Sequence, residues 1–227
     1  MRLNKFISET GMCSRREADD WIAKGRVTIN GVKAQLGTPV AEGDEVRVDR
    51  QLIRAKPKSV YILLNKPVGI TCTTERHIHG NIIDFVGHAQ RIFPVGRLDK
   101  DSEGLILLTN NGDIINKLLR SENYHEKEYA VTVDKPVTEV FLKKMASGVR
   151  ILDTVTKPCK TRQTGKYEFT IILTQGLNRQ IRRMCEVFGY TVRGLRRIRF
   201  INLKIGALKS GQWRNLTEAE LAKLLPK

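Results

Sequence analysis

The decapeptide GRLDKDSEGL, residues 96–105, lies between two apolar segments of the chain. Ile92, Phe93 and Val95 precede it, and the apolar run 105–108 follows it. Short apolar segments on either side of a polar stretch that contains glycine predict a strand, a tight turn and a second strand. The sequence therefore places a cluster of charged side chains in a turn at the end of a buried strand.

Asp99 has two candidate roles in this turn. Arg97 and Lys100 flank it, and a cation close to a carboxylate keeps that carboxylate ionised. An ionised carboxylate at a strand end can act as a nucleophile or stabilise a positive charge, but it is a poor general acid. Asp99 and Asp101 could equally be turn formers whose side chains bond neighbouring amides. Spacing alone favours the turn-forming role, because charged turns are common.

The composition is that of a basic globular protein. The 227 residues are 41% hydrophobic and 28% charged, and the formal net charge is +16. Such a chain can bury a core and form one large or two modest domains. A positive charge of this size favours a polyanionic partner, and nucleic acid before an acidic membrane.

The cysteines indicate neither a disulfide framework nor a metal site. Cys13, Cys72, Cys159 and Cys185 are widely spaced and form no C-x-x-C pair, which is typical of free thiols in a reducing cytosol. His77 and His79 follow Cys72, but with no common zinc-ligand spacing, so we expect no bound metal. No apolar run has the length of a signal peptide core or a membrane span, so we expect a cytoplasmic protein.

Residues 1–50 predict two small helices packed against short strands. Leu3, Phe6 and Ile7 have helical spacing, the segment SRRE at 14–17 is a capping box for a second helix, and NG at 30–31 is a strong hairpin signal.

Basic residues of this first module lie off the apolar helix faces, as suits contact with a phosphate backbone. They are Arg2, Lys5, Arg15, Arg16, Lys24 and Arg26. The segments RLNKF and SRREA, with the hairpin turn, are similar to the RNA-binding domain first described in ribosomal protein S4. The resemblance implies RNA binding and not catalysis.

We expect residues 51–59 to be a linker, because they are basic with little apolar content. Residues 60–227 then form a second, larger domain. Its strand and helix patterns predict an α+β fold, with an extended, mainly antiparallel mixed sheet flanked by helices.

Two further segments of the second domain carry candidate functional residues. In HEKEY, residues 125–129, Tyr129 enters an alternating strand, where it is either a packed core aromatic or a residue of a site. In GLNRQIRRM, residues 176–184, Asn178 is the expected N-cap. Arg179, Arg182 and Arg183 are expected on the solvent face of the helix, at an anion-binding helix start.

A strand from residue 192 to 201 is expected to be apolar on one side and cationic on the other, with Arg196 as a further RNA contact.

The segments GRLD and GL of residues 96–105, KEY at 127–129 and GLNRQIRRM at 176–184 resemble, in order, the motifs of RNA pseudouridine synthases. The resemblance is to the branch that contains the ribosomal small-subunit synthase A and the large-subunit synthases B, E and F, and within it to the F subgroup. It covers nearly the whole chain, including NKP at 65–67 and the ending GxxRxLTxxEL at 211–221.

The resemblance implies that the protein converts uridine to pseudouridine in RNA, with large-subunit ribosomal RNA as the expected substrate. Asp99 would be the essential carboxylate, Tyr129 would pack on the target base, and Arg182 would form a salt bridge to Asp99, with support from Arg97. Arg179 and Arg183 would then contact RNA phosphates. The isomerisation has no redox or group-carrier step, so no cofactor is expected, and the uridine must flip out of its helix to react. We expect a monomer.

Two alternatives remain open at the level of sequence. One is a pseudouridine synthase that acts on transfer RNA or on small-subunit ribosomal RNA. The other is a ribosome-associated protein of the S4 type whose second domain only binds RNA.

Overall fold

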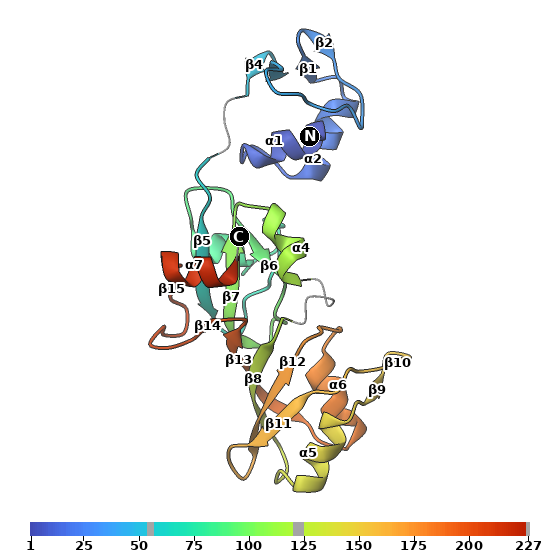
Figure 1. The fold of residues 1–227 in the computed structure, drawn as a ribbon, viewed down its shortest axis with the longest axis vertical. Helices are drawn as coiled ribbons and strands as arrows, with labels where there is room; N and C mark the ends of the chain where they lie inside the picture. The colour runs from blue at the N-terminus through green and yellow to red at the C-terminus, as the bar shows by residue number, and fades with distance from the viewer. Residues whose placement is uncertain (54–56, 120–124, 226–227) are drawn as a thin grey trace. The chain divides into compact units, whose positions relative to one another are not determined.

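The computed structural model describes residues 1–53, 57–119 and 125–225, and the chain divides into two compact units (Figure 1). Unit 1 consists of residues 1–60, 88–92 and 110–112. Unit 2 consists of residues 61–87, 93–109 and 113–227.

Unit 1 contains two helices and a four-stranded sheet. The helices are α1 (Leu3–Glu9) and α2 (Arg15–Ala23), and the strands, in the order β2-β1-β3-β4, are β1 (Val27–Ile29), β2 (Val32–Lys33), β3 (Val46–Val48) and β4 (Gln51–Leu52). The Ser14 side chain accepts from the Glu17 amide and the Glu17 side chain accepts from the Ser14 amide, which is the predicted capping box. Asn30 and Gly31 both have positive φ angles, 50° and 81°, as a two-residue type I′ hairpin requires.

The predicted linker begins three residues too early. Strand β4 pairs with β3, with Leu52 opposite Arg47, and Ile53 is buried in the core of unit 1. Residues 51–53 carry no charge, and the basic composition of the residues that follow them masked their capacity to pair with β3 and to be buried. Residues 54–56 lie outside the described residues, and the boundary near residue 60 stays a prediction.

Unit 2 is built on a nine-stranded sheet in which the principal strands have the order β11-β12-β8-β13-β7-β5-β15. The sheet is antiparallel except for the pair β13 and β7, as predicted for a mainly antiparallel mixed sheet. The strands are β5 (Tyr61–Lys66), β6 (Phe93–Val95), β7 (Glu103–Thr109), β8 (Lys127–Val133), β11 (Lys160–Gln163), β12 (Glu168–Leu173), β13 (Val192–Phe200), β14 (Leu203–Lys204) and β15 (Trp213–Asn215).

Five helices and a small hairpin accompany this sheet. The helices are α3 (Ile82–Val86), α4 (Asp113–Leu119), α5 (Glu139–Ala146), α6 (Gln180–Val187) and α7 (Glu218–Leu224), and the hairpin is β9 (Arg150–Ile151) with β10 (Thr154–Val155). Figure 1 shows α5 and α6 beside β11, β12 and β8, with α4 and α7 near the other end of the sheet.

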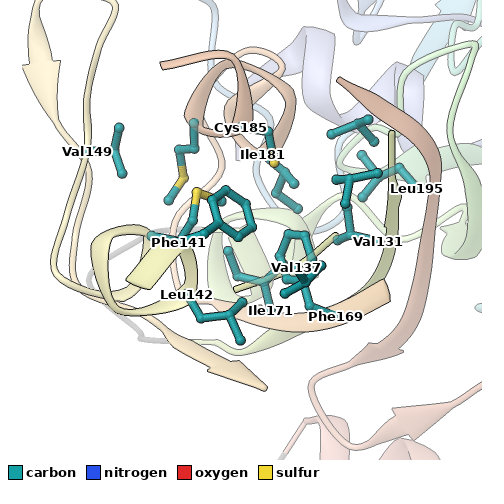
Figure 2. Packing of buried hydrophobic residues seen from close by; sticks show 14 of the residues in the cluster. Val131, Val137, Phe141, Leu142, Val149, Phe169, Ile171, Ile181, Cys185 and Leu195 are labelled. Atoms are coloured by element: carbon teal, nitrogen blue, oxygen red, sulfur yellow. The ribbon is translucent and has the colours of Figure 1, made fainter. Parts of the chain in front are cut away.

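Two hydrophobic clusters among the described residues, called here the first and the second core, lie along the sheet of unit 2. The first packs α5 and α6 on β8, β12 and the beginning of β13 (Figure 2). In this core Phe141 is stacked on Tyr190, with ring centroids 4.0 Å apart. The second packs α4 and α7 on β5, β7 and the end of β13, around Leu105 and Phe200. Strand β13 therefore belongs to both cores.

A glycine permits the close approach of β7 and β13. A Cβ atom on Gly104 would lie 2.3 Å from the Arg197 carbonyl oxygen and 2.6 Å from its amide nitrogen, closer than any side chain allows. Gly104 also has a φ of +107°. The loop between β6 and β7, residues 96–102, contains the GRLD motif and is called the GRLD turn below. Its conformation and the parallel strand pair therefore both depend on Gly104.

Candidate active site

The GRLD turn forms part of a cleft in unit 2 with a volume of about 640 Å³. Asp99 lies in the loop between β6 and β7 and lines this cleft with Tyr129 and Arg179. The lining also includes Leu195 from the first core and Phe200 from the second. The cleft therefore lies where the two cores meet, and Asp99 is in it rather than in open solvent.

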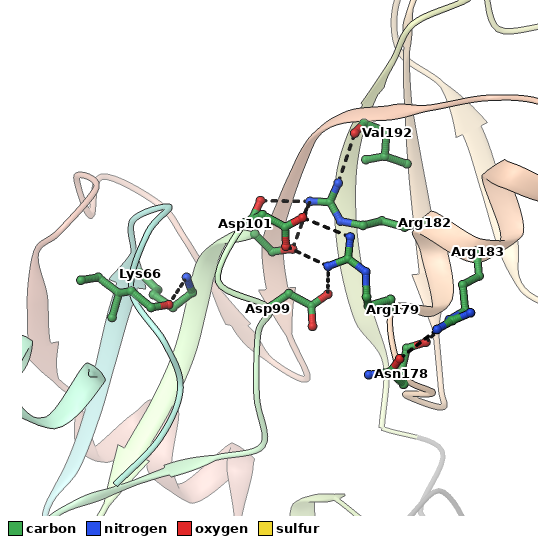
Figure 3. A network of polar contacts seen from close by, with 10 residues as sticks. Lys66, Asp99, Asp101, Asn178, Arg179, Arg182, Arg183 and Val192 are labelled. Carbon is green, nitrogen blue, oxygen red and sulfur yellow. Dashed lines mark hydrogen bonds and ion pairs between the residues drawn. The ribbon is translucent and has the colours of Figure 1, made fainter. Parts of the chain in front are cut away.

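Ion pairs join the GRLD turn to α6 (Figure 3). Arg179 contacts both oxygens of Asp101, at 3.2 Å each, and its Nη1 atom is 3.8 Å from Asp99 Oδ2. Arg182 Nη2 is 3.3 Å from Asp101 Oδ2. Partial burial raises the pKa of Asp101, but the hydrogen bonds from Arg179 and the charges of Arg182 and Arg179 outweigh it and hold this pKa below its usual value.

The predicted ion pair between Asp99 and Arg182 is not found in the described part of the chain, where Arg179 is the ion-pair partner of Asp99. Arg182 is buried, not solvent-facing as predicted: its Nη1 donates to the Val192 carbonyl at 3.1 Å and its Nη2 to the Asp101 carbonyl at 3.0 Å. Arg182 therefore links the backbone of the GRLD turn to that of β13, whereas Arg179 approaches the carboxylate of Asp99.

The start of α6 also differs from the prediction. Arg179, not Asn178, is the N-cap, and its φ of 50° is left-handed. Asn178 is engaged elsewhere, because its Oδ1 accepts from Arg183 at 3.3 Å, and Gln180 Oε1 accepts from the Leu177 amide at 3.0 Å. The left-handed residue turns the chain sharply between the cleft wall and the helix, which places the Arg179 side chain over the GRLD turn (Figure 3).

Tyr129 lies in the middle of the sheet, where it is paired with Arg197 on one side and Ile171 on the other. It is half-buried and packs against the first core while lining the cleft. The ring is therefore packed and also lines the cleft, and its role in the reaction stays a prediction. Arg97 is exposed and lines the cleft, and no ion pair joins it to Asp99 among the residues that the structure describes.

The expected RNA-binding residues lie on both units. In unit 1, Arg2, Arg15, Arg16, Lys24 and Arg26 are exposed and Lys5 is half-buried. Several of these cations have acidic partners of their own: Lys5 with Glu9 at 3.5 Å, Lys24 with Asp20 at 2.8 Å, and Arg26 with Asp49. In unit 2, Arg183 and Arg196 are half-exposed.

Sequence reasoning missed Lys127 and Arg197 as cleft residues. Arg197 is only 3% exposed, although it lies in a strand expected to be cationic on its solvent side. Leu195, Arg196 and Arg197 pair in regular register with Val131, Ala130 and Tyr129, so strand alternation puts Arg197 on the same face as Leu195. That alternation was the signal in the sequence that could have placed Arg197 on the buried face.

Among the described residues, no three His, Cys, Asp or Glu side chains are placed to hold a metal ion, and the four cysteines are free. In the same part of the chain, no helix is long and apolar enough to cross a membrane.

Comparison with known proteins agrees with this architecture. Residues 60–187 match the family model for RNA pseudouridylate synthases, and residues 1–46 match the S4 domain. The chain belongs to the RNA pseudouridylate synthase family.

Individual relatives extend this result over the whole chain. The dual-specificity RNA pseudouridine synthase RluF of Escherichia coli K12 is 56% identical over 99% of this chain and 78% of its own length. The ribosomal large subunit pseudouridine synthase B of Bacillus subtilis is 35% identical over 98% of this chain and 95% of its own length. A crystal structure of a pseudouridylate synthase has a TM-score of 0.72 and 30% identity, and covers 99% of this chain and 100% of its own.

The predicted family, the S4 module and the α+β fold are thereby confirmed. The protein is an RNA pseudouridine synthase, which isomerises uridine to pseudouridine, and the interpretation as a protein that only binds RNA is ruled out. The functional roles of individual residues stay predictions.

Proposed function

We propose that the cleft around Asp99 is where a uridine of large-subunit ribosomal RNA is converted to pseudouridine. In this isomerisation the C1′–N1 bond breaks, a C5–C1′ bond forms, C5 loses a proton and N1 gains one, so that no atom is added or removed. The observation that carries the proposal is the position of Asp99, which lines a cleft of about 640 Å³ together with Tyr129 and within 3.8 Å of Arg179.

Asp99 has the chemistry that this reaction requires. Breaking the glycosidic bond develops positive charge at C1′, which an ionised carboxylate can stabilise or capture. Arg179 places a positive charge 3.8 Å from Asp99 Oδ2, and Arg182 keeps the turn in place through the Asp101 carbonyl. The proposal covers attack of Asp99 on C1′ as well as assistance to a glycal intermediate.

Tyr129 is proposed to pack on the target base and to assist the removal of the C5 proton. Its ring is held by β8 in the middle of the sheet and faces the same cleft as Asp99. A base inside a helix cannot reach such a cleft, so the uridine must flip out of its stack before it reacts.

The S4 unit is proposed to hold the RNA by its phosphates, mainly through the exposed Arg2, Arg15 and Arg16. Phosphate contacts determine register and affinity but do not read the bases. Residues of unit 2 near the cleft, among them Arg97, Arg183 and Arg196, would hold the nucleotides around the target.

We further propose that the protein acts as a monomer in the cytoplasm. Large-subunit ribosomal RNA is proposed as substrate because the Bacillus subtilis relative is named for that subunit. Transfer RNA is the second candidate, because the Escherichia coli relative is named as a dual-specificity enzyme.

Mapping of pseudouridine tests the proposal directly. Unmodified transcripts of large-subunit ribosomal RNA, small-subunit ribosomal RNA and transfer RNA are incubated with the wild-type protein or with the Asp99→Asn variant, and pseudouridine is located by mass spectrometry. The expected result is conversion in the large-subunit transcript by the wild-type protein only. Conversion confined to the small-subunit or transfer RNA would contradict the proposed substrate, and conversion by Asp99→Asn would contradict the role of Asp99.

A further inference from the structure

Arg197 is a buried cation on the wall of the cleft. It lies on β13, is 3% exposed and lines the same cleft as Asp99 and Tyr129. Its Nε donates to the Leu105 carbonyl at 2.6 Å, and its guanidinium lies 5.3 Å from the centre of the Phe200 ring. Its Nη2 is shielded and has no hydrogen-bond partner among the described residues. A shielded donor without an acceptor is destabilising, and such donors occur where a ligand supplies the acceptor.

Lys127 is a second cation on this wall. It begins β8, two residues before Tyr129, and it also lines the cleft. Burial and, to a smaller extent, the positive charge of Arg197 lower the pKa of Lys127. Lys127 and Arg197 therefore both bring positive charge to the wall of the same cleft. An anion bound in the cleft would be attracted by both.

Two of the other cations near the GRLD turn are already engaged. Arg179 is held by both oxygens of Asp101 and approaches Asp99. Arg182 is held by the carbonyls of Val192 and Asp101. Arg197 has carboxylates neither as ion-pair nor as hydrogen-bond partners in the described part of the chain, so its charge remains available to a substrate.

The reaction generates an anion that matches this site. When the C1′–N1 bond breaks, its electron pair leaves with the base, and the negative charge of the detached uracil is shared among N1 and the two carbonyl oxygens. We propose that Arg197, with Lys127 beside it, forms an oxyanion site that binds a carbonyl oxygen of this uracil anion. The anion then turns, C5 bonds to C1′, the C5 proton leaves, and N1 is protonated.

The inference rests on the proposed function, because it places the detached base in the Asp99 cleft. In this inference Asp99 stabilises the positive charge that develops on the sugar, and Arg197 stabilises the negative charge on the detached base. Donors placed where charge develops in the transition state accelerate a reaction without strengthening substrate binding to the same extent.

Arg197 could instead act only as a brace between β13 and β7, through the Leu105 carbonyl. A brace and an oxyanion site differ in how they respond to the leaving group. Fluorine at C5 withdraws electrons, so a departing 5-fluorouracil carries negative charge better and needs less help from the protein. Loss of an oxyanion site should therefore matter less for 5-fluorouridine than for uridine, whereas loss of a brace should matter equally for both.

The experiment compares single-turnover rates on two versions of the RNA found to be modified in the mapping above, transcribed with uridine or with 5-fluorouridine. The variants are Arg197→Gln, Arg197→Lys and Lys127→Met. The matched control is Arg162→Gln, an exposed arginine on the edge strand β11. With uridine, the measured product is pseudouridine. With 5-fluorouridine, C5 carries no proton to lose, so the measured product is the rearranged C5–C1′-linked nucleotide or its water adduct. Both products are followed by mass spectrometry, RNA affinity by filter binding, and folding by circular dichroism and thermal melting.

We expect Arg197→Gln to slow conversion of uridine by about 10²- to 10³-fold, the usual effect of one lost oxyanion donor, while the RNA dissociation constant changes by less than about threefold. The loss with 5-fluorouridine should be about tenfold smaller, and Arg197→Lys should recover part of the rate because it keeps the charge. If the Arg197 variants do not fold, Lys127→Met carries the same comparison, with a smaller expected loss of about tenfold.

Equal losses on the two substrates, or a loss explained by weaker RNA binding, would overturn the oxyanion site and leave the proposed function intact. A wild-type protein that binds RNA but forms no pseudouridine would overturn both. An unchanged rate in Arg197→Gln and Lys127→Met would overturn the inference alone.

Discussion

Arg179 holds Asp101 by both carboxylate oxygens, at 3.2 Å each, and leaves only a longer contact of 3.8 Å to Asp99. The hydrogen bond that Arg179 donates to Asp101 is also the main reason why the pKa of Arg179 is raised. Asp101 therefore positions the Arg179 side chain. The carboxylate oxygens of Asp99 are not both bound by Arg179, in contrast to those of Asp101. This arrangement suits a carboxylate that must react with substrate.

Asp101→Asn should slow pseudouridine formation by about tenfold, because a charge-assisted hydrogen bond to Arg179 becomes a neutral one. Single-turnover rates and RNA affinity measured on the same transcript check this, and the effect should be on the rate. Asp153→Asn, in the exposed β9–β10 turn, is the control and should behave as wild type. A loss of RNA affinity that accounts for the whole effect would contradict the positioning role of Asp101.

Asp99→Asn should reduce the single-turnover rate by at least about 10³-fold, because an amide can neither capture nor stabilise the charge at C1′. The RNA dissociation constant should stay within about threefold of wild type, since phosphate contacts dominate affinity. Asp153→Asn serves again as the matched carboxylate-to-amide control. Measurable turnover at the wild-type rate would remove Asp99 from the reaction.

Tyr129→Phe should bind RNA normally and react about 10²-fold more slowly, because the ring remains packed in the sheet while the hydroxyl group is lost. Tyr167→Phe removes a hydroxyl from an exposed tyrosine on the same unit and is the control. Rates as a function of pH, measured under single-turnover conditions, test the assignment. If Tyr129→Phe reacts as fast as wild type, the tyrosine acts only by packing.

Arg15→Gln combined with Arg16→Gln should weaken RNA binding. The slope of the logarithm of the binding constant against the logarithm of the salt concentration should become shallower by about one unit for each lost phosphate contact. Both residues are exposed at the start of α2. Lys143→Gln with Lys144→Gln, on α5, removes the same charge from unit 2 and should leave the slope unchanged. An unaltered slope in the first variant would count against the S4 unit as an RNA-binding surface.

Glu220→Gln should destabilise the protein at neutral pH and progressively less in acid. The hydrogen bond from Arg214 lowers the pKa of Glu220 to about 2, from 4.5 in the unfolded chain. A lowered pKa in the folded state means that the contribution is complete above pH 4.5 and is lost as the pH falls towards 2. The difference in melting temperature between wild type and variant, measured from pH 7 to pH 2.5, should shrink over that window. A difference that is independent of pH would show that Glu220 stabilises only by packing and by capping α7.

Local signals predicted much of the fold. The capping box at Ser14 starts α2 as predicted, because it needs only two residues three positions apart. A capping box at Thr217 starts α7 in the same way. The Asn30-Gly31 hairpin likewise follows from backbone preferences within the turn. The family resemblance of the GRLD turn added the enzyme class, which spacing alone did not favour.

The remaining features depended on contacts between distant segments. Asn178 has the preference of an N-cap, but its side chain binds Arg183 and the left-handed Arg179 takes its place. The helical spacing of Arg182 predicts a solvent-facing side chain. In the structure Arg182 is buried and donates to carbonyls of β13 and of the GRLD turn. Arg197 lies on the face of Leu195 in β13, and its guanidinium is held by the carbonyl of Leu105, which belongs to a strand far away in the sequence.

Strand β13, which the first and the second core of unit 2 share, determines how the enzyme loses activity on heating. Val192 and Leu195 belong to one core, and Phe200 belongs to the other, with the cleft between them. Neither core can unfold without displacing the backbone of β13, which forms the wall of the catalytic cleft. Heat inactivation and cooperative unfolding of unit 2 should therefore coincide, and a partially unfolded yet active enzyme should not accumulate.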